Sequence, residues 1–282
     1  MPPPDRMLAT LRRAVELVKA TPGRTGHFVH LQNCDDVLVV GDLHGHVPNF
    51  QAVWKLADLA NHPRRHLVLQ ELIHGKFPYP NGGEKSHQVV DLFAVAKGQF
   101  PDRVHYLPGN HEMGQWTGRK ILKGDADLNE QFRLGVLAAY GQAAMPEIYR
   151  TYMELFQACP LGLLTPNHVF LSHTLIPAKH LAGFRVSQLE QEAYDAKDLQ
   201  PGGVVYGILW GRDTDAATAA AFLQKVGADL LVTGHIPADD GFTVPNDRQV
   251  TLDCSASPGG YVLFPADRPL THAELVACVG VV

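Results

Sequence analysis

Two short motifs combine glycine with residue types that bind metal ions. The first is Gly41-Asp42-Leu43-His44-Gly45, and the second is Gly109-Asn110-His111-Glu112. Each follows an apolar run that predicts a buried strand, so the polar side chains would lie at strand ends. An Asp-x-His and an Asn-His at neighbouring strand ends can hold two metal ions close together. Such a pair of ions activates water against phosphorus esters.

Three further candidate ligands also follow apolar runs. His173 and His235 come after later runs, and Glu71 is the only acidic residue at the end of the run 66–69. The ions of a two-metal site lie about 3.5–4 Å apart, so one carboxylate must bridge them, and Glu71 is the candidate bridge. The expected metal ligands, in chain order, are Asp42, His44, Glu71, Asn110, His173 and His235.

The chemistry of this ligand set indicates which metal it would bind. Carboxylate, imidazole and amide oxygen together suit Mn²⁺, Fe or Zn²⁺ better than Mg²⁺ or Ca²⁺, which prefer oxygen ligands alone. We expect two metal ions as cofactors, with manganese first and iron or zinc as alternatives.

Apolar runs predict the elements that would position these residues. Strands are expected at 37–40, 66–69 and 104–107, with helices at 47–60 and 89–97 between them. Three strand–loop–helix units with polar residues at the strand ends are typical of an α/β sheet with a site along its carboxyl edge. Short apolar runs at 169–171, 230–232, 249–252 and 261–264, with a helix at about 215–226, predict a second sheet packed on the first.

We expect a single domain over 1–282, because the candidate ligands spread from Asp42 to His235 and no Ser/Gly-rich linker interrupts them. An amphipathic helix within 1–24 is expected to end at Thr21-Pro22-Gly23. The segment 112–165 is expected to be a helical segment near the site, and residues 127–158 within it are expected to be mostly helical, interrupted around Met145-Pro146, and to cover one side of the site.

Composition limits the partners and the compartment. The chain of 282 residues is 45% hydrophobic, enough for a sizeable core, and its net charge of −5 lacks the basic field of a nucleic-acid-binding protein. The amino terminus lacks the apolar core of a signal peptide, and no run approaches the roughly 18 apolar residues of a membrane span. Four separated cysteines indicate buried free thiols. We therefore expect a cytoplasmic protein that binds neither nucleic acid nor membrane.

These motifs resemble the calcineurin-like metallophosphoesterase superfamily and, within it, the bacterial phosphoprotein phosphatases of the serine/threonine type. That family's pattern is GDxHG, GDxxDRG, GNHE, a later histidine after a strand, and a final histidine. The first and third motifs are present here, and the spacing between motifs is similar over roughly residues 35–264. The resemblance implies a four-layer α/β/β/α sandwich of two mixed sheets flanked by helices.

The resemblance also implies roles for the ligands. Asp42 and His44 would hold one ion, and Glu71 would bridge it to a second ion held by Asn110, His173 and His235. A hydroxide shared by both ions would attack phosphorus in line.

Catalytic and phosphate-binding roles follow from the same resemblance. His111 would donate a proton to the departing oxygen, and Glu112 would support the loop. Arg212, in Leu209-Trp210-Gly211-Arg212-Asp213, lies where related bacterial enzymes place a phosphate-binding arginine. Its planar guanidinium would hold two phosphoryl oxygens, and Asn110 would also contact the phosphate.

The second motif departs from the family pattern. The chain has Gln70-Glu71-Leu72-Ile73-His74-Gly75-Lys76, so the bridging Asp becomes Glu71 and the phosphate-binding Arg becomes Gly75. The acid that orients the GNHE histidine becomes His74, whose neutral imidazole would accept a hydrogen bond but offers no negative charge. His74 is interpreted as a partner of His111, an extra ligand or a loop residue, and Lys76 as a substitute phosphate contact.

Three functions are compatible with these residues. The first is a metal-dependent phosphoesterase that hydrolyses phosphomonoesters of proteins or small molecules, including phosphoserine and phosphothreonine. The second is hydrolysis of a nucleotide anhydride such as a dinucleoside polyphosphate, because loss of the arginine leaves room for a different leaving group. The third is a pseudophosphatase that keeps the metals and binds a phosphorylated partner without cleaving it.

Overall fold

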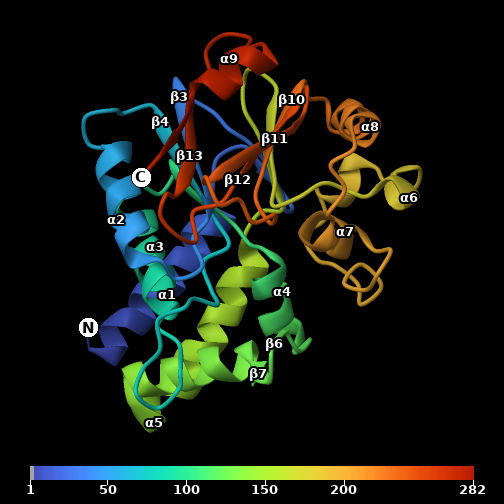
Figure 1. Ribbon diagram of the computed structural model, residues 1–282. Helices are drawn as coiled ribbons and strands as arrows, with labels where there is room; N and C mark the ends of the chain where they lie inside the picture. The colour runs from blue at the N-terminus through green and yellow to red at the C-terminus, as the bar shows by residue number, and fades with distance from the viewer. Residues whose placement is uncertain (1–2) are drawn as a thin grey trace.

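The computed structural model describes residues 3–282, in which two β-sheets pack face to face between layers of helices (Figure 1). The five-stranded sheet has the order β14-β13-β3-β4-β5. Strands β3, β4 and β5 are parallel, and β13 is antiparallel to both β3 and β14. The bounds are β3 (Asp36–Asp42), β4 (Arg65–Gln70), β5 (Val104–Leu107), β13 (Gly260–Pro265) and β14 (Val279–Val281).

The seven-stranded sheet has the order β1-β2-β8-β9-β10-β12-β11. Its central strands β9, β10 and β12 are parallel, so their carboxyl ends share one edge. A separate two-stranded sheet joins β6 (Leu122–Lys123) and β7 (Ala126–Asp127). The seven strands are β1 (Arg24–Thr25), β2 (Phe28–His30), β8 (Gly162–Leu164), β9 (Val169–Leu171), β10 (Leu230–Thr233), β11 (Phe242–Asn246) and β12 (Gln249–Leu252).

Helices cover the outer face of each sheet (Figure 1). One layer packs on the five-stranded sheet and contains α1 (Pro4–Lys19), α2 (Val47–Ala57), α3 (His87–Gln99) and α5 (Leu128–Ala158). The other packs on the seven-stranded sheet and contains α6 (Ala178–Leu181), α7 (Val204–Trp210) and α8 (Ala216–Val226). The remaining helices are α4 (Asn110–Thr117), η1 (Val186–Gln188) and α9 (His272–Ala277). The expected four-layer α/β/β/α sandwich is confirmed.

Strand β3 shows why an apolar run becomes a central strand. Alternate side chains of a strand point to opposite faces, and here both faces are covered. Leu38 and Val40 pack against the helical layer, whereas Val37 and Val39 pack against the seven-stranded sheet. All four side chains are fully buried, so the polar residues that follow lie at the end of a rigid element.

The helical segments differ in detail from the sequence-based expectation. Within 112–165, the hairpin of β6 and β7 separates α4 from α5. The interruption of α5 lies at Gly141, not at Met145-Pro146 as expected, and Pro146 lies inside the helix after it. Gly141 adopts φ 76° and ψ 167°, a conformation that is strained for any residue with a side chain.

At the chain's start, the helix expected within 1–24 is α1, and residues 1 and 2 of that range lie outside the described part. No helix in residues 3–282 is both long enough and apolar enough to span a membrane.

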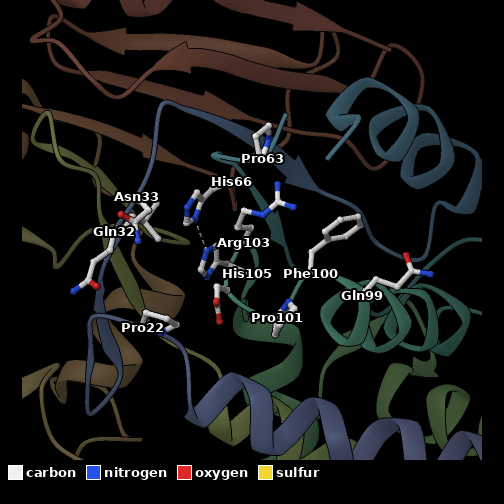
Figure 2. A pocket seen from close by; sticks show the side chains of 12 residues that line it. Pro22, Gln32, Asn33, Pro63, His66, Gln99, Phe100, Pro101, Arg103 and His105 are labelled. Atoms are coloured by element: carbon white, nitrogen blue, oxygen red, sulfur yellow. Dashed lines mark hydrogen bonds between the residues drawn. The ribbon is translucent and has the colours of Figure 1, made fainter. Parts of the chain in front are cut away.

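A cavity of about 300 Å³ lies at the amino ends of β4 and β5, away from the strand ends that carry the candidate ligands (Figure 2). Its wall contains a buried histidine pair, in which the Nδ1 atom of His66 lies 2.9 Å from the Nε2 atom of His105. Burial lowers the pKa of His66 to about 4, so this pair is neutral at physiological pH.

Candidate metal centre

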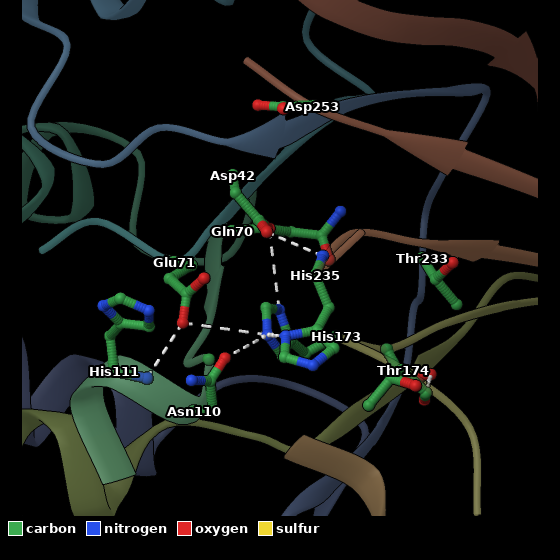
Figure 3. A network of polar contacts seen from close by, with 12 residues as sticks. Asp42, Gln70, Glu71, Asn110, His111, His173, Thr174, Thr233, His235 and Asp253 are labelled. Atoms are coloured by element: carbon green, nitrogen blue, oxygen red, sulfur yellow. Dashed lines mark hydrogen bonds and ion pairs between the residues drawn. The ribbon is translucent and has the colours of Figure 1, made fainter. Parts of the chain in front are cut away.

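Five of the six expected ligands meet at one edge, where the strand ends of both sheets converge (Figure 3), and the sixth, His44, lies beside Glu71. Asp42 ends β3, Glu71 follows β4, and Asn110 begins α4 just after β5. His173 and His235 follow β9 and β10 by two residues. Because parallel strands present their carboxyl ends together, residues far apart in the chain become neighbours.

Glu71 lies between two groups of candidate ligands. Its Oε2 atom is 3.3 Å from the Nε2 atom of His44, and its Oε1 atom is 3.7 Å from the Nε2 atom of His173. Ligand atoms of His44, Glu71 and His111 lie within 4.8 Å of one another, and so do those of Glu71, His173 and His235. The one carboxylate shared by both groups is the residue expected to bridge two ions.

The side chains of Asn110 and Asp42 lie beside the second group. The Nε2 atom of His173 is 3.1 Å from the Nδ1 atom of His235 and 3.4 Å from the Oδ1 atom of Asn110. The Nδ1 atom of His173 is 3.5 Å from the Oδ1 atom of Asp42. The Oδ2 atom of Asp42 accepts the backbone N–H of His235 at 2.6 Å, which fixes the carboxylate.

The protonation behaviour of these side chains fits bound cations. Burial raises the pKa of Asp42 to about 7, and burial and then the charge of Asp42 raise the pKa of Glu71 well above its usual value. Burial lowers the pKa of His173 to about 3 and that of His235 to about 2. Metal binding requires neutral imidazoles, and cations would offset the cost of two adjacent buried carboxylates.

Unpartnered buried atoms support the same conclusion. Buried polar atoms are normally hydrogen-bonded, and each exception needs a reason. The Oδ1 atom of Asp42, the Nδ1 atom of His173 and the Nε2 atom of His235 are buried and have no hydrogen-bond partner. The donor set therefore fits metal ions by its chemistry, its burial and its unfilled bonding capacity.

Two glycines allow the carboxylates to approach the backbone. A Cβ atom on Gly109 would lie 2.0 Å from the Oε1 atom of Glu71, and one on Gly234 would lie 2.2 Å from the Oδ1 atom of Asp42. Neither position tolerates a side chain without displacing a ligand. Gly109 and Gly234 are therefore part of the site's geometry.

Four site residues adopt a left-handed backbone that non-glycine residues rarely use. The φ values are 42° for His44, 31° for Glu71, 67° for His74 and 68° for His235. Strained backbone of this kind persists where surrounding contacts enforce it, and it clusters at functional sites. The strain is consistent with side chains held in place for chemistry.

Glu112 supports the loop, as its position in the motif suggested. Its carboxylate accepts the backbone N–H groups of Leu72 at 2.9 Å, Ile73 at 3.1 Å and Gly109 at 2.7 Å, and it is fully buried. These bonds tie the loop after β4 to the start of α4. They also connect Glu71 with Asn110 and His111.

His111 lies between two other histidines at the mouth of the site. Its ring centroid is 5.0 Å from those of both His44 and His74, and its backbone N–H donates to the Oε1 atom of Glu71 at 2.9 Å. His74 is buried, and its Nδ1 atom is 3.0 Å from the Oε1 atom of Glu84. His74 is therefore neither a solvated loop residue nor a member of either ligand group.

Glu84 is a site residue that the sequence did not indicate. It lies in the Gly/Pro-rich loop before α3, where no periodic pattern marks buried positions, yet it is only 2% exposed. Ser86, the residue before α3, donates its hydroxyl to Glu84 at 2.6 Å.

The residues expected to bind phosphate lie in different places. Lys76 is exposed on the wall of a cleft of about 590 Å³ that is also lined by His44, His74, His111 and Lys123. Arg212 is exposed and is not among the residues that line this cleft. Its positive charge contributes, after burial, to lowering the pKa of His173 and of His235, which places it near the second ligand group.

Comparison with known proteins shows a family match and several relatives. The family model for calcineurin-like phosphoesterases matches residues 36–239. A probable serine/threonine-protein phosphatase of Encephalitozoon cuniculi is 27% identical over 261 residues, which cover 84% of this chain and 51% of the relative. A PP2A-like serine/threonine-protein phosphatase of Candida albicans is 25% identical, over 79% of this chain and 47% of the relative. The chain thus spans about half the length of these relatives.

Solved structures share the fold. A protein serine/threonine phosphatase from Saccharomyces cerevisiae aligns with a TM-score of 0.71 at 16% identity, covering all of this chain and 90% of that one. A cold-active protein-tyrosine phosphatase of a psychrophilic Shewanella aligns with a TM-score of 0.60 at 14% identity, covering 87% and 78%. At these identities the likeness concerns the fold alone.

Proposed function

The chain belongs to the calcineurin-like phosphoesterase family, and we propose that it is a metal-dependent phosphatase that hydrolyses phosphomonoesters at a dinuclear metal site. The observation that carries this proposal is the position of Glu71, whose carboxylate is shared by two groups of ligands. A single-metal site would need no shared carboxylate.

The ligands divide between two ions. Asp42 and His44 would hold one, Asn110, His173 and His235 would hold the other, and Glu71 would contact both. Manganese is the proposed metal, because imidazole and carboxylate ligands together suit it. When bound, the two cations would lower the pKa of water and neutralise negative charge on the phosphoryl group.

The other side chains of the site act on the substrate. His111 lies at the mouth of the cleft, where its imidazole would give a proton to the leaving oxygen. Lys76 lines the same cleft and would attract a phosphate group, although its ammonium lacks the forked geometry of an arginine. Arg212 would contact the phosphate from the side of His173 and His235.

Phosphoserine or phosphothreonine in proteins is the proposed substrate class. Support comes from the relatives whose names state serine/threonine-protein phosphatase. Dinucleoside polyphosphates are the comparison substrates, because Gly75 replaces the arginine that holds the phosphate in the family's pattern.

The test measures metal content and turnover on one preparation. Purified protein reconstituted with Mn²⁺ is assayed against phosphoserine peptides, aryl phosphates and dinucleoside polyphosphates, and bound metal is counted per chain. We expect two ions per chain and phosphate release from monoesters that Asp42→Asn abolishes. Asp58→Asn is the matched control, because Asp58 is an exposed helix-capping residue in the left-handed conformation that asparagine also tolerates.

Each outcome bears on the proposal. Turnover confined to dinucleoside polyphosphates would replace the monoesterase assignment with an anhydride hydrolase. Two bound ions without turnover of any substrate would identify a pseudophosphatase. A single bound ion, or equal activity in Asp42→Asn, would contradict the dinuclear site itself.

A further inference from the structure

Glu84 holds His74 in a defined orientation beside His111. Its Oε1 atom lies 3.0 Å from the Nδ1 atom of His74, and it also accepts the backbone N–H of His74 at 3.2 Å and the hydroxyl of Ser86 at 2.6 Å. The side chains of His74 and Glu84 are 0% and 3% exposed. The carboxylate of Glu84 therefore binds both the ring and the backbone N–H of His74.

Glu84 is fixed by packing as well as by these bonds. Its backbone N–H donates to the carbonyl of Gln131 on α5 at 2.9 Å, and a Cβ atom on Gly135 would lie 1.9 Å from its carbonyl oxygen. The ring of Phe132 meets that of His74 edge-on, with the centroids 6.3 Å apart. The loop that carries Glu84 is thus packed between helix α5 and His74.

This arrangement costs stability. The Oε2 atom of Glu84 and the Nε2 atom of His74 are both buried without a hydrogen-bond partner. A buried carboxylate with one unpartnered oxygen is expensive, and a fold selected only for stability would avoid it. A role in the chemistry of the site accounts for this cost.

The Glu84 bond sets which nitrogen of His74 carries the proton. A carboxylate only accepts hydrogen bonds, so the Nδ1 atom of neutral His74 must be the donor. The Nε2 atom is then an acceptor that lacks a donor. The adjacent ring, His111, has a buried Nδ1 atom that lacks a partner, and the two ring centroids are 5.0 Å apart.

We propose that Glu84 and His74 together replace the missing acid of the second motif and position His111 for proton donation. In this arrangement a rotation of the His111 ring would bring its Nδ1–H group to the Nε2 atom of His74, a hydrogen bond that these two atoms do not make in this structure, while the Nδ1–H group of His74 donates to Glu84. The negative charge that the family's acid would place beside His111 is thus supplied by Glu84, one imidazole further away. This inference rests on the proposed phosphatase function and names Glu84 and His74 as positioning residues.

The reaction step that depends on this arrangement is protonation of the leaving group. A water molecule first gives one proton to solvent, and the oxygen of the resulting hydroxide forms the new bond to phosphorus as the bond to the leaving oxygen breaks. The leaving oxygen keeps that electron pair and takes a proton from the Nε2 atom of His111. His111 must enter this step doubly protonated, although burial and then the charges of the neighbouring histidines lower its pKa, and it is left neutral with its Nδ1–H group facing His74.

The kinetic test compares leaving groups that differ in their need for a proton. Glu84→Gln should lower kcat on a phosphoserine peptide on the order of 10- to 100-fold, within the range of general acid catalysis. On 2,4-dinitrophenyl phosphate, whose leaving oxygen departs without a proton, the same variant should change kcat less than about threefold. Glu154→Gln, an exposed glutamate on α5, is the matched control. Equal losses on both substrates would indicate a merely structural role and overturn the proposal.

A double variant tests whether Glu84 acts through His74. His74→Asp supplies a carboxylate directly beside His111, so adding Glu84→Gln to it should change kcat on the peptide far less than Glu84→Gln does alone. The same loss in both backgrounds would contradict the relay. Thermal melting of each variant identifies any loss that comes from unfolding.

A spectroscopic measurement separates this inference from the phosphatase function. Long-range ¹H–¹⁵N correlation spectra of the purified protein, labelled at histidine, report which ring nitrogen carries the proton. We expect His74 to be protonated at Nδ1 and not at Nε2, whether or not any substrate is turned over. Turnover together with an Nε2-protonated His74 would refute the relay and leave the phosphatase function standing, whereas the expected tautomer without turnover would refute only that function.

Discussion

Replacing Gly109 with alanine tests whether Glu71 is the shared ligand. The new Cβ atom would lie 2.0 Å from the Oε1 atom of Glu71, whereas ordinary contacts begin at 3.4 Å. The carboxylate must therefore retreat by more than about 1 Å, although metal–ligand distances tolerate only about 0.2 Å. The backbone of Gly109, at φ −104° and ψ −170°, suits any residue, so the collision alone determines the outcome.

The expected result is a loss of metal affinity from a folded protein. Glu71 contacts both ligand groups, so we expect Mn²⁺ affinity to fall on the order of 100-fold, which is about 2.7 kcal/mol. Isothermal titration with Mn²⁺ measures the change. Gly98→Ala is the matched control, because a Cβ atom there meets nothing within 4 Å and alanine stabilises a helix by up to about 1 kcal/mol. Two ions bound with unchanged affinity in Gly109→Ala would refute the bridging role of Glu71.

Three further predictions concern stability. The pKa of Asp42 is about 7 in the folded protein and 3.8 in the unfolded chain, so the unfolding free energy without metal should fall as pH rises between these values. Mn²⁺ should therefore raise Tm more at pH 7.5 than at pH 5. An equal rise in Tm at both pH values would contradict this. Asp91 accepts the hydroxyls of Tyr140 and Tyr152, so urea unfolding of Asp91→Ala should show a loss of about 2–4 kcal/mol, and a loss below about 1 would refute the network's role. Burial lowers the pKa of Lys97 to about 8. The unfolding free energy of the wild-type protein minus that of Lys97→Met should therefore rise between pH 8 and 10.5. A difference that stays constant over this range would contradict the lowered pKa.

The core strands were predictable because a continuous apolar run indicates a strand that is buried on both faces. The runs at 37–40, 66–69 and 104–107 are all strands of the five-stranded sheet. Helix ends were less predictable, since single residues decide them. The helix expected at 47–60 ends at Ala57, because Asp58 adopts a left-handed conformation with φ 41°. Strands β2 and β8 have three residues each, too few for a pattern to emerge.

The meeting of the candidate ligands was predictable from the sequence, and the residues that support them were not. Asp42, His173 and His235 each follow a recognisable strand, so their meeting follows from strand order alone. Glu84 reaches His74 only because the loop before α3 folds back against α5, and no local pattern encodes that path. The sequence therefore indicated that an acid was missing from the second motif, and only the structure supplied its replacement.

The residues that differ from the family pattern in the second motif fit one another in this structure. A Cβ atom on Gly75 would lie 2.4 Å from the backbone carbonyl oxygen of His44, so an arginine at this position would displace His44, a proposed metal ligand. His44, Glu71 and His74 all adopt positive φ, so the loops after β3 and β4 fit against each other through uncommon conformations. Restoring the family's arginine alone should therefore distort the proposed metal site instead of adding a phosphate contact. The retained ligands, the glycine at 75 and the buried Glu84 depend on one another, which argues against random decay of an ancestral motif.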